Sequence, residues 1–213
     1  MTEVVTVHGG AGVPDPAVLA RVVAALGAGE VVVLPTDTVY GLAASPAVEG
    51  ATDRLFALKG RRRDVPLAVL CADAGQALAL ADPASVTAEV RRVAERLWPG
   101  PLTLVLPRRP GLRYALGEPA ATIGVRCPDH PLVRAVAAAT GPLATTSANR
   151  HGRPTPAAAP AVAVALGPGP ALVVDGGPCA GTPSTVVDLT GSRWSAVREG
   201  ALSLAAVQAA AAP

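Results

Sequence analysis

The chain has 213 residues, half of them apolar, and a formal charge of +2 at pH 7, and this length suits one substantial domain and is short for two. A charge this small does not by itself indicate a nucleic-acid binder, and no run of about twenty apolar residues indicates a membrane span. The three cysteines are odd in number and far apart, and no signal peptide is recognisable, so a disulfide framework is excluded and a reduced, cytoplasmic protein is expected.

Helices and strands alternate through the first half of the sequence. Asp15 and Pro16 have the character of an N-cap and a first helical residue, and they begin an apolar-periodic helix that ends at Gly27. The β-branched run over 31–34, ended by a proline, predicts a buried strand. The elements expected next are a helix over 51–58, a strand over 67–71, a helix over 82–97 and a strand over 102–106. The stretch up to Gly12 has no clear pattern.

The second half continues the alternation. Strands are expected over 122–126, 143–146, 171–174, 185–189 and 195–198, and helices over 131–140, 157–166 and 202–211. Strands mixed with helices of this length predict an α/β fold, and three short strands crowded into the last third predict a twisted mixed sheet rather than a parallel one. Because no repeat or long linker appears, we expect a single domain over 1–213 with its core at about 15–200.

The basic residues are skewed in type, since 17 are Arg and one, Lys59, is Lys. In a chain so rich in Ala, Gly and Pro, this skew is typical of a compositional drift that replaces Lys by Arg wherever Arg serves. A lysine that survives is then a candidate for a position that needs a compact ammonium group. From composition alone, chance explains the single lysine equally well.

Familiar catalytic motifs are absent from the sequence. There is no glycine-rich phosphate loop, no dinucleotide fingerprint and no nucleophile elbow. His8, His130 and His151 have no metal-ligand spacing, so we expect no metal held by the protein. Any functional site must therefore be sought among other polar residues.

Polar residues gather where the predicted elements end. Thr36-Asp37-Thr38 follow the strand over 31–34, at the end where open α/β sheets bind ligands, although an ordinary capped turn has the same composition. Lys59 and Arg61 follow the helix over 51–58. Cations there complement the helix dipole, and they are also able to hold a triphosphate.

A third cluster lies on the strand over 122–126. Period-two alternation places Thr122, Gly124 and Arg126 on one face of this strand. Arg126 then needs a partner, and both a substrate carboxylate held by two hydrogen bonds and an internal Asp or Glu would serve.

The last two clusters follow strands near the C-terminal end. The hydroxyl groups of Thr145 and Ser147 and the amide of Asn149 suit phosphate and ribose contacts, although a capped turn looks the same. Arg198 adds a further cation at a strand end. Each cluster is a weak signal, but five of them at element ends, rich in cations and hydroxyl groups, favour a basic cleft for an anionic ligand.

These segments, in this order, resemble the YrdC-like family of threonylcarbamoyl-AMP synthases. The matching stretches are PTDTVYGL (35–42), LKGRRRDVPLAVL (58–70), WPGPLTLVL (98–106), TIGVRCPDHP (122–131), TTSANRHGRPT (145–155), STVVDL (184–189) and VREG (197–200). The resemblance implies a twisted α/β sheet with a basic concave cleft. It also implies a nucleotidyltransferase that condenses L-threonine, bicarbonate and ATP, with Mg²⁺ accompanying the ATP, and releases pyrophosphate. The other product, threonylcarbamoyl-AMP, would serve tRNA threonylcarbamoyladenosine modification.

The resemblance also implies roles for individual residues. The catalytic cations are Lys59, Arg61 and Arg198. The threonine-binding residues are Thr36, Arg126 and Thr145, and the ATP-binding residues are Lys59, Arg61, Thr122, Ser147, Asn149, Thr155 and Arg198. Leu70 is a departure, because several relatives carry at this position a histidine that contacts threonine. A mobile lid is expected in the Gly/Pro-rich stretch after Asn149.

Contact with tRNA and a downstream threonylcarbamoyl-transferase are the further partners that the resemblance implies. Two rival functions remain open from the sequence. One is a non-enzymatic RNA-binding protein that uses the same basic cleft, which the low charge and the scarcity of aromatic residues disfavour. The other is a carbamoyl-adenylate-forming relative, whose known members sit in much longer chains with zinc-finger and acylphosphatase parts.

Overall fold

The computed structural model describes residues 2–7 and 15–213. The helices are α1 (Pro16–Gly27), α2 (Ala51–Lys59), α3 (Ala74–Leu78), α4 (Ala88–Leu97), α5 (Pro131–Thr140), α6 (Ala159–Leu166) and α7 (Leu204–Ala211). The strands are β1 (Glu3–Thr6), β2 (Val32–Leu34), β3 (Gly41–Ala44), β4 (Ala68–Leu70), β5 (Leu102–Pro107), β6 (Thr122–Arg126), β7 (Leu143–Ser147), β8 (Leu172–Asp175), β9 (Thr185–Asp188) and β10 (Ser195–Arg198). His8 and the rest of 8–14 lie outside the described residues, whereas the stretch with no clear pattern contains β1 in its described part.

The ten strands form one sheet in the order β1-β8-β2-β3-β7-β4-β6-β5-β9-β10. The sheet contains both parallel neighbours, such as β4 and β6, and antiparallel neighbours, such as β4 and β7. The predicted mixed α/β sheet is therefore confirmed. Strands distant in the sequence are adjacent in space, and this brings the predicted polar clusters together.

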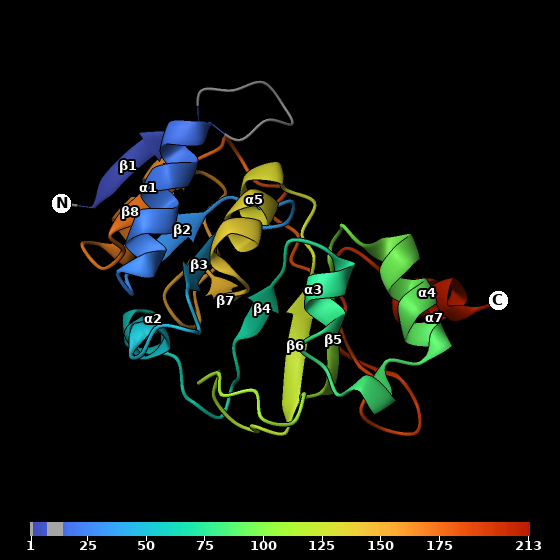
Figure 1. The fold of residues 1–213 in the computed structure, drawn as a ribbon. Coiled ribbons are helices and arrows are strands. Elements are labelled where there is room, and N and C mark those ends of the chain that lie inside the picture. The colour runs from blue at the N-terminus through green and yellow to red at the C-terminus, as the bar shows by residue number, and fades with distance from the viewer. Residues whose placement is uncertain (1, 8–14) are drawn as a thin grey trace.

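Two aliphatic cores hold the helices on the sheet. On one face, α1 and α5 lie side by side over the half of the sheet that contains β2, β3 and β7 (Figure 1). Their buried residues Val22 and Val133 belong to the same core as Leu34 and Leu143 of the sheet. The remaining helices belong to a second core on the other face, where Leu55 of α2 is fully buried. Helices α4 and α7 lie side by side at the end of the molecule opposite β1 (Figure 1).

Some predicted elements differ from the structure. The helix expected over 82–97 is in fact a 3₁₀ turn, Pro83–Ser85, followed by α4. Asp82 caps the turn and Thr87 caps α4 with its own side chain, so two N-caps separate the two pieces. Strands β1 and β3 and the short helix α3 were not expected. None of the helices in the described part of the chain is long and apolar enough to cross a membrane.

Strand β6 shows how the sheet separates core from site. Ile123 and Val125 are buried in the second core, and Thr122, Gly124 and Arg126 face a cavity on the opposite side. The alternation predicted for this strand is confirmed. Because helices α1 and α5 cover the other half of this face, the half formed by β4, β6, β5 and β9 is left free to hold a ligand.

Candidate functional site

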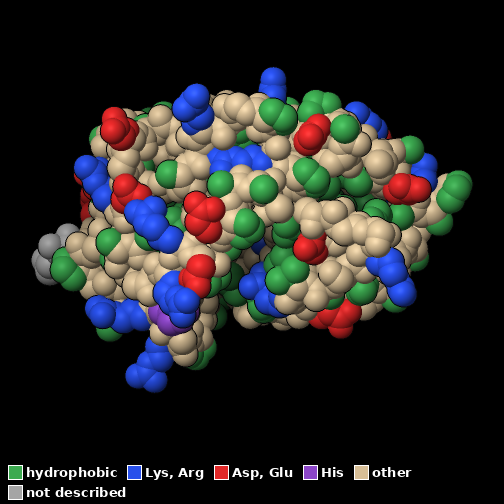
Figure 2. Space-filling model, turned by 90° about the horizontal axis from the view of Figure 1, so that it is seen from below, with side chains coloured by type: hydrophobic (Ala, Val, Ile, Leu, Met, Phe, Trp, Pro, Cys, Tyr) green, Lys and Arg blue, Asp and Glu red, His purple; other side chains and the backbone are tan. Residues whose placement is uncertain are grey.

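A cavity of about 790 Å³ lies over this uncovered half of the sheet. This volume is within the range of about 300–1,000 Å³ that is usual for small-molecule sites. Figure 2 shows a hollow near the middle of the face seen from below, with Lys or Arg side chains beside it. Four arginines line the cavity, together with many hydroxyl side chains, and no Asp, Glu, His or Cys is among the lining residues of the described chain. The cavity is therefore suited to anions.

Nine of the ten site residues expected from the sequence line this one cavity. They are Thr36, Arg61, Thr122, Arg126, Thr145, Ser147, Asn149, Thr155 and Arg198. They come from segments up to 162 residues apart (198 − 36), so the sheet order is what assembles them. The tenth residue, Lys59, lies behind Ser147 and Asn149 instead of on the cavity wall.

Lys59 ends helix α2 and is buried, with 4% of its surface exposed. Its Nζ donates hydrogen bonds to the Ser147 carbonyl (2.5 Å), the Ser147 hydroxyl (3.0 Å) and Asn149 Oδ1 (2.5 Å). An ammonium group has three protons, so all three are used. Burial, with a smaller effect of the nearby Arg61 charge, lowers the pKa of Lys59 to about 8. In this structure Lys59 organises the segment after β7, and its predicted contact with phosphate stays a prediction.

Asn149 is the centre of a second set of hydrogen bonds. Its Oδ1 accepts from Ser147 Oγ at 2.6 Å and from Thr155 Oγ1 at 3.2 Å, in addition to Lys59. Its Nδ2 donates to the carbonyl groups of Arg150 and Arg153. The loop that carries Thr155 is thereby tied to the end of β7, and the side chains expected to bind nucleotide are held in one arrangement.

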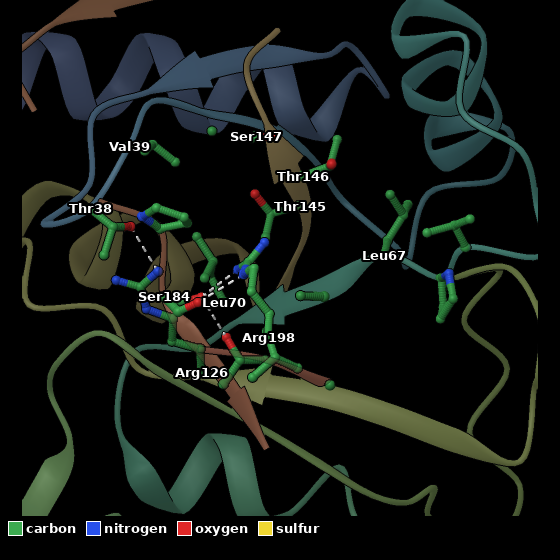
Figure 3. Close-up of a pocket in the computed structure, with 18 of the residues that line it drawn as sticks. Thr38, Val39, Leu67, Leu70, Arg126, Thr145, Thr146, Ser147, Ser184 and Arg198 are labelled. Carbon is green, nitrogen blue, oxygen red and sulfur yellow. Dashed lines mark hydrogen bonds between the residues drawn. The ribbon is translucent and has the colours of Figure 1, made fainter. Parts of the chain in front are cut away.

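Arg61 and Arg198 lie on the same cavity, close enough for their charges to interact. Burial, followed by the positive charge of Arg198, lowers the pKa of Arg61. Arg61 is anchored by its Nε and Nη2 to the carbonyl groups of Val65 (2.7 Å) and Pro66 (2.9 Å). Arg198 donates to the carbonyl and the hydroxyl of Ser184, at 3.0 and 3.1 Å (Figure 3). Neither of the two has an ion-pair partner among the described residues, so a bound polyanion would neutralise both.

Arg126 ends β6 and is the most enclosed of the cavity's arginines. Its Nη2 lies 2.5 Å from Asp37 Oδ1, and only 6% of the Arg126 side chain and 14% of the Asp37 side chain are exposed. Of the two partners expected for this arginine, the internal carboxylate is present. A role of Arg126 in holding a substrate carboxylate therefore has to use its remaining N–H groups.

Three of the four predicted threonines, other than Thr155, differ in their freedom to bind a ligand. Thr36 Oγ1 donates to the Val39 carbonyl at 2.7 Å and accepts from the Thr38 and Val39 amides. Thr145 Oγ1 donates to the Leu42 carbonyl at 2.9 Å, which leaves its lone pairs free. Thr122 lies at the start of β6, half-buried on the cavity wall.

Comparisons with known proteins show the family to which the chain belongs. The family model Sua5_yciO_yrdC, described as "Telomere recombination", matches residues 24–200. The chain belongs to this family. A threonylcarbamoyl-AMP synthase of Bacillus subtilis is 38% identical over 202 residues, which are 93% of this chain and 58% of that protein. A putative threonylcarbamoyl-AMP synthase of Mycobacterium tuberculosis is 38% identical, over 85% of this chain and 83% of the relative.

Solved structures of the same family are similar over nearly the whole chain. The crystal structure of Pyrococcus abyssi Sua5 complexed with L-threonine has a TM-score of 0.90 at 33% identity, and it covers 98% of this chain and 61% of that one. The crystal structure of Escherichia coli YciO has a TM-score of 0.84 at 25% identity, over 96% and 98% of the two chains. The chain thus spans about three fifths of the Sua5 structure and nearly all of YciO.

Several cavity residues of this family member were given no role of their own from the sequence, although Thr38 was named within its polar cluster. Thr38, Thr103, Arg153 and Ser184 all line the cavity. Thr103 lies in β5, and Ser184 directly precedes the neighbouring strand β9. Thr103 Oγ1 and Ser184 Oγ are 3.1 Å apart. Ser184 is inside the matching stretch STVVDL, and Thr103 alternates with the buried Leu102 and Leu104, so a test of strand alternation would have found both.

Leu70 is the cross-strand neighbour of Arg126 and is 4% exposed on the cavity wall. At the position where the family resemblance led us to expect histidine, this chain therefore has an apolar group beside the enclosed arginine. The described residues contain no group of three or more His, Cys, Asp or Glu side chains that could hold a metal ion. A Mg²⁺ ion held by the protein alone does not fit the cavity wall, which carries no carboxylate among the described residues, because Mg²⁺ is held mainly by carboxylates and phosphates.

Proposed function

We propose that the chain is an L-threonylcarbamoyl-AMP synthase, a nucleotidyltransferase that condenses L-threonine, bicarbonate and ATP and releases pyrophosphate. The observation that carries the proposal is the cavity itself, which has Arg61, Arg198 and the enclosed Arg126 on its wall, with no lining carboxylate in the described chain. Such a cavity suits a polyphosphate and a carboxylate together. The names of its relatives agree with this assignment.

The nucleotide would take the part of the cavity with the exposed cations. Arg61 and Arg198 would hold its phosphates, and Lys59 would act with them through Ser147 and Asn149. Thr122 and Thr155, which lie on the wall of the same cavity, would complete the pocket. A positively charged and fixed environment of this kind stabilises the charge that develops during transfer at phosphorus.

Threonine would take the enclosed part of the cavity. Arg126 would hold its carboxylate, and Thr36 and Thr145 are close by on the wall. Leu70 would then face the substrate side chain with an apolar surface. Figure 3 shows Arg126, Leu70 and Thr145 around this part of the cavity.

The chemistry needs two anions to meet rather than a protein proton acceptor. Bicarbonate loses hydroxide to give carbon dioxide, and the threonine amine nitrogen bonds to that carbon to form a carbamate. The proton lost from the nitrogen joins the hydroxide as water. A carbamate oxygen then bonds to the α-phosphorus of ATP, and the bond from that phosphorus to the bridging oxygen breaks and releases pyrophosphate. The arginines would offset the repulsion between these anions, and Mg²⁺ would enter with the nucleotide, held by phosphate oxygens. Because carbamates hydrolyse readily, the enclosed position of Arg126 would also protect them from water.

The product would be consumed by a threonylcarbamoyl-transferase in tRNA modification, in the cytoplasm. Direct contact of this chain with tRNA would use the basic side chains beside the hollow in Figure 2. The loop at 150–158, part of which lines the cavity, is where a lid would close.

The test is pyrophosphate release from ATP by the purified protein, with threonine and bicarbonate each omitted in turn. Release that needs both supports the synthase. Release that needs carbamoyl phosphate and not threonine would support the carbamoyl-adenylate former. Salt-dependent tRNA binding with no pyrophosphate under any combination would support an RNA-binding protein instead.

A further inference from the structure

The four arginines that line the cavity do not have equal surroundings. Arg126 is the one with a carboxylate partner among the described residues, whereas Arg61, Arg153 and Arg198 form no ion pair there. Arg126 is also the most buried of the four, with 5% of its surface exposed. A guanidinium this enclosed needs a counter-ion, because an unpaired buried charge is strongly destabilising.

Three acceptors hold the Arg126 guanidinium at three different nitrogens. Nε donates to the Gly100 carbonyl at 3.0 Å, Nη1 donates to Thr38 Oγ1 at 3.0 Å, and Nη2 donates to Asp37 Oδ1 at 2.5 Å. Arginine has five N–H groups, so one on Nη1 and one on Nη2 remain. The orientation of these two groups is set by the three bonds already made.

The turn that supplies two of these acceptors is itself fixed. Thr36 Oγ1 uses its single proton on the Val39 carbonyl, so in the 3.0 Å pair of hydroxyl groups Thr38 is the donor and Thr36 the acceptor. Thr38 Oγ1 is then free to accept from Arg126. The hydrogen bonds therefore run in one direction, from Arg126 through Thr38 to Thr36, and Asp37 is held between these two threonines.

Asp37 lies outside the cavity, although both of its neighbours line it. Thr36 and Thr38 are on the wall, but Asp37 is not among the lining residues. Its carboxylate therefore holds Arg126 without lining the cavity. A carboxylate in this place does not need to leave when a ligand binds, because it is not on the cavity wall.

We propose that Asp37 is a positioning residue, which directs the two remaining N–H groups of Arg126 into the cavity and so determines the affinity for the carboxylate of the substrate. The inference rests on the proposed function, because it takes threonine as the ligand of Arg126. The opposite possibility is that Asp37 competes with the substrate for Arg126. Positioning and competition change threonine affinity in opposite directions, so one experiment separates them.

The experiment measures KM for threonine, KM for ATP and kcat in the wild-type chain and in Asp37→Asn, Asp37→Ala and Asp37→Glu. A charge-assisted hydrogen bond is worth about 1.5–3 kcal/mol, so we expect KM for threonine to rise about 10- to 100-fold in Asp37→Ala. KM for threonine should rise less in Asp37→Asn, because asparagine keeps an acceptor oxygen. In Asp37→Glu, part of the lost threonine affinity should be recovered. KM for ATP and kcat at saturating threonine should change less than about 2-fold.

Asp53→Asn is the matched control, because Asp53 also forms an ion pair with an arginine, Arg63, but both side chains are 56% exposed. It should leave both KM values unchanged. If Asp37→Ala does not fold, Thr38→Val removes the neighbouring acceptor of Arg126 and is expected to raise KM for threonine alone, with Thr38→Ser close to wild type.

A lower KM for threonine in Asp37→Asn would overturn the proposal in favour of competition, and equal changes in both KM values would overturn it in favour of a general structural role. Threonine binding by calorimetry separates this inference from the proposed function. If the wild-type chain binds threonine but releases no pyrophosphate, the proposed function fails, and the same series of variants still tests Asp37 by affinity. If it binds no threonine, both fail.

Discussion

The protonation of Lys59 is the property of this site that the structure allows to be worked out furthest. Burial lowers its pKa from 10.5 to about 8. At about 1.4 kcal/mol per pH unit, this difference corresponds to ~3 kcal/mol of preference for the neutral amine in the folded chain. Three hydrogen bonds from the ammonium to Ser147 and Asn149 favour the charged form and oppose the effect of burial.

The sign of the effect on stability follows from this lowered value. Between pH 8 and 10.5 the unfolded chain keeps a proton on Lys59 that the folded chain has lost. The free energy of unfolding should therefore rise with pH in this window, and below pH 8 the folded chain bears the full cost of about 3 kcal/mol. Lys59→Met cannot titrate, so the difference between wild type and this variant isolates the contribution of Lys59 from those of tyrosines and cysteines.

The assay uses the fact that the chain contains one lysine. Growth on isotope-labelled lysine gives one side-chain NMR signal, and its titration gives the pKa of Lys59 directly, with the urea-unfolded chain as the reference near 10.5. The neutral amine has only two protons for three acceptors, so KM for ATP should also rise as the pH passes about 8. A folded-state pKa of 10 or higher, or a stability difference between wild type and Lys59→Met that does not change between pH 8 and 10.5, would refute the reasoning.

Further predictions concern the two parts of the cavity. Lys59→Ala should abolish pyrophosphate release while the chain stays folded by circular dichroism, and an active variant would contradict the proposed function. Arg126→Ala should raise KM for threonine far more than KM for ATP; it should also lower the melting temperature, because Asp37 is left buried without a partner, a change that costs about 3–5 kcal/mol. Arg198→Gln should show the opposite kinetic pattern, with KM for ATP rising about 10-fold or more. Gly124→Ala should fold normally, because the nearest atom to the added Cβ would be Thr103 Cγ2 at 3.5 Å, but should weaken substrate binding by narrowing the cavity floor; unchanged kinetics would remove Gly124 from the site.

The period of the strands was predictable from the sequence, and so was much of the site. Alternation along 122–126 separated Ile123 and Val125 from Arg126 correctly, because the side chains of a strand point to opposite faces whatever the strand's neighbours are. The same local rule explains why polar residues at strand ends were good candidates. Caps were predictable too, since Asp15 accepts from the amides of Ala17 and Val18, two and three residues further on.

Contacts between distant segments were decided only by the tertiary structure. The sequence left open whether Arg126 pairs with a substrate or with an internal carboxylate, and the sheet places Asp37, 89 residues away, beside it. It also favoured Lys59 as a residue that touches the ligand, whereas the position of α2 buries its ammonium behind Ser147, 88 residues later. Residue types and periods are local properties of the chain, but which groups meet depends on the order β7-β4-β6-β5-β9, and that order is selected by the packing of the whole sheet.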